Sequence, residues 1–215
     1  MEYSKDCPFC KDTRFHNNKL VNLPAEDSIL FENKNIYVQV DISPLCLGHI
    51  LIITHKHYLN FYETPNNIKR DVIKLKNNIK KIYKELYNMD VLFFEHGSAK
   101  SGFAGSSIDH AHLHCIPYNS DVIKSLNNIL GEPIKCNILA LNSQYKNEFS
   151  YIYVENSKSN KFIYKVDKLP SQFLRKLVSE KLNSSNYLWQ ENCLTSNNSL
   201  CLKQTIADLK NKITI

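Results

Sequence analysis

The sequence predicts an α+β fold in two parts, a unit over residues 1–120 and an extension over residues 121–215 that packs on it. The first observation is a set of strand-like apolar runs that flank one long stretch with helical periodicity. The second is the composition: 43% of the 215 residues are hydrophobic and 22% are charged, which is enough apolar material for a buried core. These values exclude a chain that is disordered throughout.

The first unit is predicted to contain several strands and one long helix. We expect Thr64 to cap this helix, with Pro65 in its first position, and the apolar residues keep helical spacing to about Asn88. A loop rich in Gly and Ser, residues 97–105, precedes the last strand of the unit. The expected strands are residues 35–41, 49–54, 91–94 and 108–117.

The extension carries weaker patterns. Its expected elements are helices at residues 121–130, 171–182 and 205–212 and a hairpin of residues 151–155 and 161–166. Ser171, Gln172 and Arg175 lie at the start of a helix, where an arginine could bind an anion. The interpretation that we favour is an ordinary helix cap with a solvated Arg175.

Charge and cysteine content limit the partners. The formal net charge of +6 suits an anionic substrate but does not indicate nucleic-acid binding, because the lysines are spread along the chain. No run approaches the roughly 20 apolar residues that a spanning helix needs, and the first residues lack the apolar core of a secretory signal. The seven cysteines therefore indicate reduced thiols or metal ligands, and we expect a cytoplasmic protein with no membrane partner.

A row of histidines carries the strongest chemical signal. On a strand, His110, His112 and His114 project from one face, while the residues between them project into a core. A solvated polar face is the alternative, but an exposed sheet rarely needs three adjacent imidazoles. A neutral imidazole is a good nucleophile near pH 7, and its neighbours can donate hydrogen bonds to phosphate oxygens. The row therefore suits phosphoryl chemistry.

This row resembles the motif of the histidine triad (HIT) superfamily, in which three histidines alternate with apolar residues. Residues 40–44 (VDISP), residues 48–53 (GHILII) and the amino-terminal residues 7–10 (CPFC) are also similar to segments of that family. The resemblance covers roughly residues 7–118. It implies an antiparallel sheet of about five strands with one long helix across it, often paired into a homodimer. His49, at the start of one of these strands, is expected either to support the triad by a hydrogen bond or to be an ordinary buried histidine.

The resemblance also implies a mechanism. His112 would attack the α-phosphorus of a nucleotide derivative and form a nucleotidyl-histidine, while His114 would bind phosphate oxygens. The remaining substrate-binding candidates are Asp41 and Ile42 at the nucleoside, Gly105 and Ser107 near the phosphate or the leaving group, and Glu95 and His96 at the start of the phosphate loop.

Two positions depart from the family pattern. Many small members have an asparagine where this chain has Glu95-His96, and a carboxylate there would repel phosphate unless it pairs with His96 or a lysine. The usual proline near residue 54 is Thr54. Both changes put the substrate in doubt, but neither removes the nucleophile.

A second site is indicated by Cys7 and Cys10, which have the spacing of a zinc knuckle. Tetrahedral zinc needs two more ligands, which the resemblance places at His57 and His110, with His55 as the alternative to His57. Such a Cys₂His₂ site would be structural, and it would remove His110 from acid–base work.

The expected function is a nucleotide hydrolase that releases a nucleoside monophosphate from a dinucleoside polyphosphate, a nucleoside phosphoramidate or a similar compound. One alternative is a nucleotidyltransferase or phosphorylase of the same superfamily, although those branches tend to have glutamine at the place of His114. Another is a zinc-stabilised nucleotide-binding module without turnover.

Overall fold

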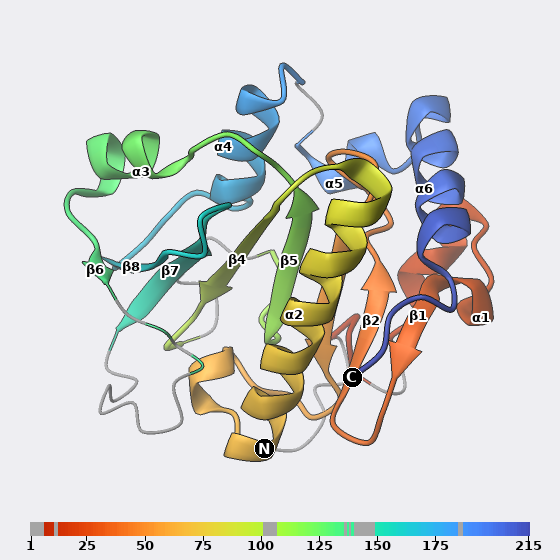
Figure 1. The fold of residues 1–215 in the computed structure, drawn as a ribbon, viewed down its shortest axis with the longest axis horizontal. Helices are drawn as coiled ribbons and strands as arrows, with labels where there is room; N and C mark the ends of the chain where they lie inside the picture. The colour runs from red at the N-terminus through yellow and green to blue at the C-terminus, as the bar shows by residue number, and fades with distance from the viewer. Residues whose placement is uncertain are drawn as a thin grey trace.

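Eight strands form one antiparallel sheet in the order β1-β2-β3-β5-β4-β7-β8-β6 (Figure 1). The computed structural model describes residues 7–10, 13–100, 107–135, 137, 139, 149–184 and 187–215, and the elements named here lie within them. The strands are β1 (Ile29–Glu32), β2 (Ile36–Val40), β3 (Ile50–Thr54), β4 (Val91–Gly97), β5 (His112–Pro117), β6 (Ile134–Lys135), β7 (Ser150–Glu155) and β8 (Lys161–Val166). The expected five-stranded sheet is present as β1–β5, and the extension adds three strands beside β4.

The helices confirm the α+β class. They are the 3₁₀ helices η1 (His16–Val21) and η2 (Phe61–Glu63) and the α-helices α1 (Ala25–Ser28), α2 (Asn66–Tyr87), α3 (Ile123–Leu130), α4 (Phe173–Lys181), α5 (Trp189–Asn192) and α6 (Ser196–Leu209). Helix α6 begins well before the predicted residue 205, because the side chain of Thr195 caps it by accepting a hydrogen bond from the Asn198 N–H. None of the described helices is both long and apolar enough to cross a membrane.

Helix α2 is the long predicted helix, and it lies across one face of the sheet (Figure 1). Its buried stripe includes Val72, Leu75 and Ile79, which pack in a core with residues of β2, β3 and β5. The cap differs from the prediction. Pro65 takes the cap position, because the Thr64 hydroxyl donates a hydrogen bond back to the carbonyl of Phe61 at the end of η2.

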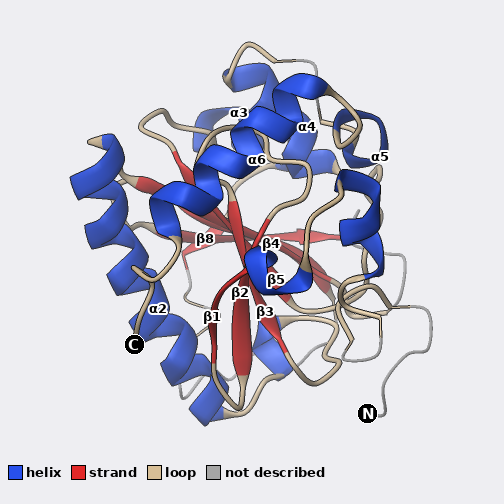
Figure 2. Ribbon diagram, turned by 90° about the vertical axis from the view of Figure 1, so that its right-hand side faces the viewer, coloured by secondary structure: helices blue, strands red, loops and turns tan. Residues whose placement is uncertain are grey.

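The opposite face of the sheet is covered by two separate segments. Helices α3 and α4 bury Leu126, Leu174 and Val178 against the strands β4, β7 and β8. The amino-terminal segment packs Phe9 and its neighbouring cysteines on β2 and β3. In Figure 2, helix α2 lies on one side of the strands and helices α4 and α5 lie on the other. The candidate site lies on this second face.

Candidate active site and metal site

The triad strand divides its side chains between the two faces, as the alternation predicts. Leu113 and Cys115 enter the core beneath α2. His112 and His114 pair with Ile53 and Leu51 of β3 and line a cavity on the opposite face. The strand itself begins at His112, so that His110 precedes it, whereas the sequence predicted a strand from residue 108.

The hydrogen bonds of His112 fix which ring nitrogen can react. Its Nδ1 lies 2.6 Å from the carbonyl oxygen of His110, and this nitrogen must carry the proton in order to donate to it. The lone pair is therefore on Nε2. Burial lowers the pKa of His112 below its usual value, which keeps the ring neutral near pH 7. The cavity thus contains an imidazole in the form that acts as a nucleophile.

His114 is held in the opposite tautomer by a chain of hydrogen bonds. The backbone N–H of Leu45 donates to His49 Nδ1 at 3.1 Å, so His49 carries its proton on Nε2. That nitrogen lies 2.9 Å from His114 Nδ1, which must accept, and His114 is left with a proton on Nε2. Burial lowers the pKa of His49 to about 4 and that of His114 well below its usual value. The site therefore combines a hydrogen-bond donor on His114 with the Nε2 lone pair of His112, and His49 supports His114 by a hydrogen bond, which was one of its two expected roles.

Arg175 of helix α4 reaches into the site from the extension. Its Nη1 donates to Asp41 Oδ2 at 2.7 Å and its Nη2 donates to the carbonyl of Ser43 at 2.6 Å. Arg175 is only 5% exposed, so the favoured interpretation of a solvated arginine was wrong. Burial alone would raise the pKa of Asp41, but the guanidinium of Arg175, with His49, holds it below its usual value.

This ion pair was hard to predict from the sequence, because the partners are 134 residues apart. One signal was available. Arg175 is one of only three arginines in a chain with 27 lysines and arginines. Since arginine binds planar carboxylates in a way that lysine cannot, a rare arginine within an apolar helix face is a candidate for a buried ion pair.

The cavity lies between the two segments that cover this face. Among the residues expected at the substrate, six line it: Asp41, Ile42, His96, Ser107, His112 and His114. Gly105 lies outside the described residues. The amino-terminal segment contributes Phe9, and the extension contributes Arg175 and Trp189.

Glu95 is expected at the substrate but does not line the cavity. It lies next to His96 on β4, and successive residues of a strand face opposite sides of the sheet. Its carboxyl group accepts hydrogen bonds from the Phe61 N–H and the Tyr151 hydroxyl, and burial raises its pKa to about 8. The expected repulsion between Glu95 and phosphate therefore does not arise, and neither does a pair with His96.

His96 contacts the extension instead. Its Nε2 accepts a hydrogen bond from the backbone N–H of Leu174 at 3.3 Å, in the first turn of α4. Burial lowers the pKa of His96 to about 3, so its ring is neutral. Strand alternation places Glu95 and His96 on opposite faces of the sheet, just as Phe93 and Phe94 are buried on the two opposite faces.

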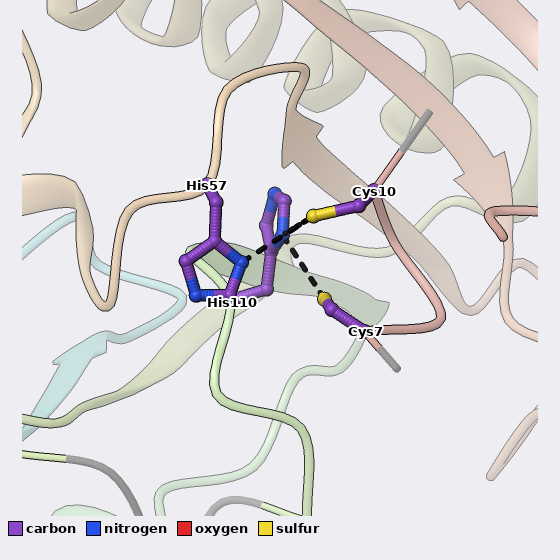
Figure 3. A group of neighbouring side chains, drawn as sticks. All are labelled: Cys7, Cys10, His57 and His110. Carbon is purple, nitrogen blue, oxygen red and sulfur yellow. Dashed lines mark hydrogen bonds between the residues drawn. The ribbon is translucent and has the colours of Figure 1, made fainter. Parts of the chain in front are cut away.

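A second cluster brings together Cys7, Cys10, His57 and His110 (Figure 3). The Cys7 Sγ lies 3.3 Å from His110 Nδ1, and the Cys10 Sγ lies 3.4 Å from His57 Nδ1 and 3.8 Å from His110 Nδ1. Tetrahedral zinc with usual bond lengths places sulfur and nitrogen ligands about 3.6 Å apart. The donors and their spacing therefore fit a Cys₂His₂ metal site.

Hydrogen bonds to backbone carbonyls indicate which histidines are available to bind a metal in the cluster. His110 Nε2 lies 2.7 Å from the Thr54 carbonyl and donates to it, which leaves Nδ1 free to bind a metal. His55, the alternative ligand, instead contacts the carbonyl of Asn33 through its Nε2 at 2.8 Å. The structure thus brings His57 to the cysteines and not His55. His110 is absent from the lining of the cavity that contains the other two triad histidines.

Comparison with known proteins gives several matches. The family model described as "Protein similar to CwfJ C-terminal" matches residues 1–130. An uncharacterized HIT-like protein of Methanocaldococcus jannaschii is 28% identical over 116 residues, which are 54% of this chain and 81% of the relative. An uncharacterized HIT-like protein of Rickettsia prowazekii is 31% identical over 96 residues, which are 44% of this chain and 78% of the relative. The diadenosine triphosphate hydrolase of Plasmodium falciparum, solved in complex with cyclomarin A, is 25% identical with a TM-score of 0.38, covering 51% of this chain and 82% of that chain.

Proposed function

This chain belongs to the histidine triad superfamily and to the family of proteins similar to the CwfJ C-terminal region, and on that premise we propose that it is a nucleotide hydrolase. It would act on a dinucleoside polyphosphate, a nucleoside phosphoramidate or a similar compound and release a nucleoside monophosphate. One observation carries the proposal: the neutral ring of His112, with its Nδ1 proton held by the His110 carbonyl, lines the cavity with its lone pair on Nε2.

In the first step, His112 Nε2 attacks the α-phosphorus and forms a P–N bond. The bond from that phosphorus to the leaving group breaks, and the leaving group takes its electron pair and a proton from solvent or a neighbouring donor. The positive charge that develops on the ring is stabilised by the hydrogen bond from Nδ1 to the His110 carbonyl. In the second step, water attacks the same phosphorus and loses a proton to solvent, the P–N bond breaks with its electron pair returning to Nε2, and the nucleoside monophosphate is released.

His114 is proposed to stabilise the phosphorus centre in both steps. Its Nε2 proton can donate to a non-bridging oxygen, and the hydrogen bond from His49 prevents the other tautomer, which would offer a lone pair to the phosphate instead. Asp41 and Ile42 are proposed to contact the nucleoside. Because Arg175 already occupies Asp41 Oδ2, a ribose hydroxyl would share this carboxylate with the guanidinium.

The extension is proposed to be an integral part of the active site, although we expect residues 1–120 to contain the catalytic motif. Arg175 and Trp189 line the same cavity as His112, and His96 is bonded to the first turn of α4.

We assign a structural zinc ion to Cys7, Cys10, His57 and His110, which leaves His110 without a proton-transfer role. When bound, zinc would join the amino-terminal segment to the residue that precedes the triad strand. The ring of His110 would then be fixed from two sides, by the metal at Nδ1 and by the Thr54 carbonyl at Nε2.

The experiment compares the wild type with His112→Asn and His114→Gln in the zinc-loaded protein. Diadenosine triphosphate and adenosine 5′-phosphoramidate are supplied, nucleotide products are separated by chromatography, and intact protein mass is recorded. We expect AMP from the wild type, no AMP and no adduct from His112→Asn, and slower release from His114→Gln with a detectable added mass of one AMP. If a folded wild type releases no AMP and forms no adduct, the hydrolase proposal is rejected.

A second arm of the experiment tests the phosphorylase alternative. With adenosine 5′-phosphoramidate as substrate and inorganic phosphate as acceptor, a phosphorylase converts the bound AMP into ADP, whereas a hydrolase forms AMP at the same rate with and without phosphate. This substrate is used because hydrolysis of diadenosine triphosphate itself releases ADP. Formation of ADP that requires both phosphate and His112 would replace the hydrolase by the phosphorylase.

A further inference from the structure

Two amide side chains, Gln39 and Asn18, lie in the wall of the cavity on the side away from the histidines. Gln39 of β2 pairs with Leu51 of β3, which in turn pairs with His114 of β5. Adjacent strands are about 4.8 Å apart, so Gln39 lies two strands, or about 10 Å, from His114. This separation is comparable to that between the phosphate and the base of a nucleotide. A phosphate at His112 and His114 would therefore place the base near Gln39.

These amides are buried but incompletely hydrogen-bonded. Gln39 and Asn18 are 4% and 2% exposed, and Gln39 Nε2 donates to Asn18 Oδ1 at 3.2 Å. Gln39 Oε1 and Asn18 Nδ2 have no partner among the described residues. An unpaired buried amide atom is costly unless a ligand or water satisfies it, and a wall of apolar side chains would have avoided that cost. The pair is therefore suited to a ligand that offers both a donor and an acceptor.

The chemistry of two bonded amides narrows this requirement. If both amides rotate by half a turn, Asn18 donates to Gln39, and the unpaired atoms become Asn18 Oδ1 and Gln39 Nε2. In either arrangement the pair offers one donor and one acceptor, but their order is reversed. Adenine presents a donor (the 6-amino group) beside an acceptor (N1), and guanine presents an acceptor (O6) beside a donor (N1–H) at the same positions. One arrangement of the amides fits each base.

We propose that Gln39 and Asn18 form a base-reading pair that prefers adenine and guanine nucleotides to a purine nucleotide without an exocyclic group on this edge of the base. This inference rests on the proposed function, and it names the substrate class of the same site. Phe9, Leu51 and Ile108 supply apolar surface in the same cavity for the faces of the purine ring. A base without the exocyclic group leaves one amide atom unpaired, and such a site rejects the analogue more strongly than an apolar pocket does.

Trp189 provides the readout. It is the only tryptophan of the chain, it lines this cavity, and its indole N–H has no partner among the described residues. Its fluorescence is therefore expected to change when a base enters. The probes are AMP, GMP and purine riboside 5′-monophosphate, which is AMP without the 6-amino group. These monophosphates have no leaving group on phosphorus, so binding is measured without turnover.

The proteins are the zinc-loaded wild type, Gln39→Met, which keeps the length of the side chain without its amide, and Gln204→Met as the control. Gln204 is exposed on α6, where it donates to Asp208, and it is absent from the cavity lining. We expect the wild type and Gln204→Met to bind AMP and GMP at least about 10-fold more tightly than purine riboside monophosphate. Gln39→Met should bind the three compounds with dissociation constants within about 3-fold of one another.

The outcomes separate this inference from the proposed function. If the wild type binds AMP and purine riboside monophosphate equally while it still releases AMP from its substrates, base reading is rejected and the hydrolase stands. If it binds AMP at least 10-fold more tightly than GMP, the reversible order of the two amides is rejected. If no nucleotide binds and no substrate turns over, the proposed function fails first. The wild-type comparison alone decides the question if Gln39→Met does not fold.

Discussion

Replacing Arg175 by methionine removes a buried positive charge and leaves the carboxylate of Asp41 without its main partner. The guanidinium makes hydrogen bonds to Asp41, to the Ser43 carbonyl and, at 3.2 Å, to the Tyr187 carbonyl. Removal of one partner from a buried ion pair costs about 3–5 kcal/mol, because the remaining charge stays desolvated and uncompensated. We therefore expect Arg175→Met to lower the free energy of unfolding by about 3–5 kcal/mol, measured by urea denaturation at pH 7.

The control is Arg14→Met. Arg14 forms an ion pair with Glu32 at the same distance, 2.7 Å, but the side chain of Glu32 is 42% exposed. An exposed pair contributes only about 0–1 kcal/mol, so this variant should lose little stability. The two variants compare a buried ion pair with a more exposed one at the same N–O distance.

A double-mutant cycle with Asp41→Asn tests whether the loss comes from the pair. The double variant contains neither buried charge, so its loss should be smaller than the sum of the two single losses by at least about 2 kcal/mol. Additive losses, or an Arg175→Met variant as stable as Arg14→Met, would show that Arg175 contributes packing and no electrostatic support.

The sign of the pH dependence provides an independent check. In the wild type the pKa of Asp41 lies below its usual value, so its contribution is present above about pH 4 and is lost as the pH falls. Without Arg175, burial raises the pKa of Asp41, and stability should then decrease as the pH rises above 4. The difference between wild type and Arg175→Met should accordingly widen from pH 4 to pH 7.

Three further predictions concern buried groups elsewhere in the site. Because burial raises the pKa of Glu95 to about 8, the folded protein retains a proton that the unfolded chain releases near pH 4.5. In urea unfolding, the stability of Glu95→Gln relative to wild type should therefore rise by about 3 kcal/mol from pH 5 to pH 8. A stability difference that does not change with pH would contradict a protonated carboxyl group. Because burial lowers the pKa of His96 to about 3, the stability of the wild type should fall as the pH drops below 6.5. Between pH 7.5 and pH 5, His96→Gln should lose about 2 kcal/mol less stability than the wild type. The same dependence of stability on pH in both proteins would refute this prediction. Chelation of zinc should lower the melting temperature of the wild type and of Cys46→Ser, whose cysteine lies outside the metal cluster. Cys7→Ser should have a lower melting temperature before chelation and a smaller decrease on chelation. A wild type that contains no zinc and does not respond to chelators would reject the metal site.

The sequence was sufficient where local periodicity and short spacing carry the information. The alternation from His110 to Cys115 predicted which side chains enter the core, and the CxxC spacing identified both cysteines of the cluster. These features depend on two or three neighbouring residues of one strand or one turn. They are therefore visible without knowledge of the rest of the fold.

Features that depend on strand pairing or on distant segments were not predicted. The hairpin of β7 and β8 was expected, but periodicity does not indicate that β7 pairs with β4. Arg175 was expected in solvent because its carboxylate partner belongs to another part of the chain. Glu95 was assigned to the substrate from its position along the chain, although the face of β4 on which it lies depends on the register with β5.

The pairing of β7 with β4 has a consequence for self-association. A strand at the border of a sheet exposes backbone donors and acceptors to which another copy of the chain can add. In this protein the side of β4 away from β5 pairs with β7 of the extension, and among the described strands the outermost are β1 and the two-residue β6. The extension therefore occupies the position in which a second subunit would continue the sheet across β4, and the described sheet leaves backbone edges only at β1 and β6.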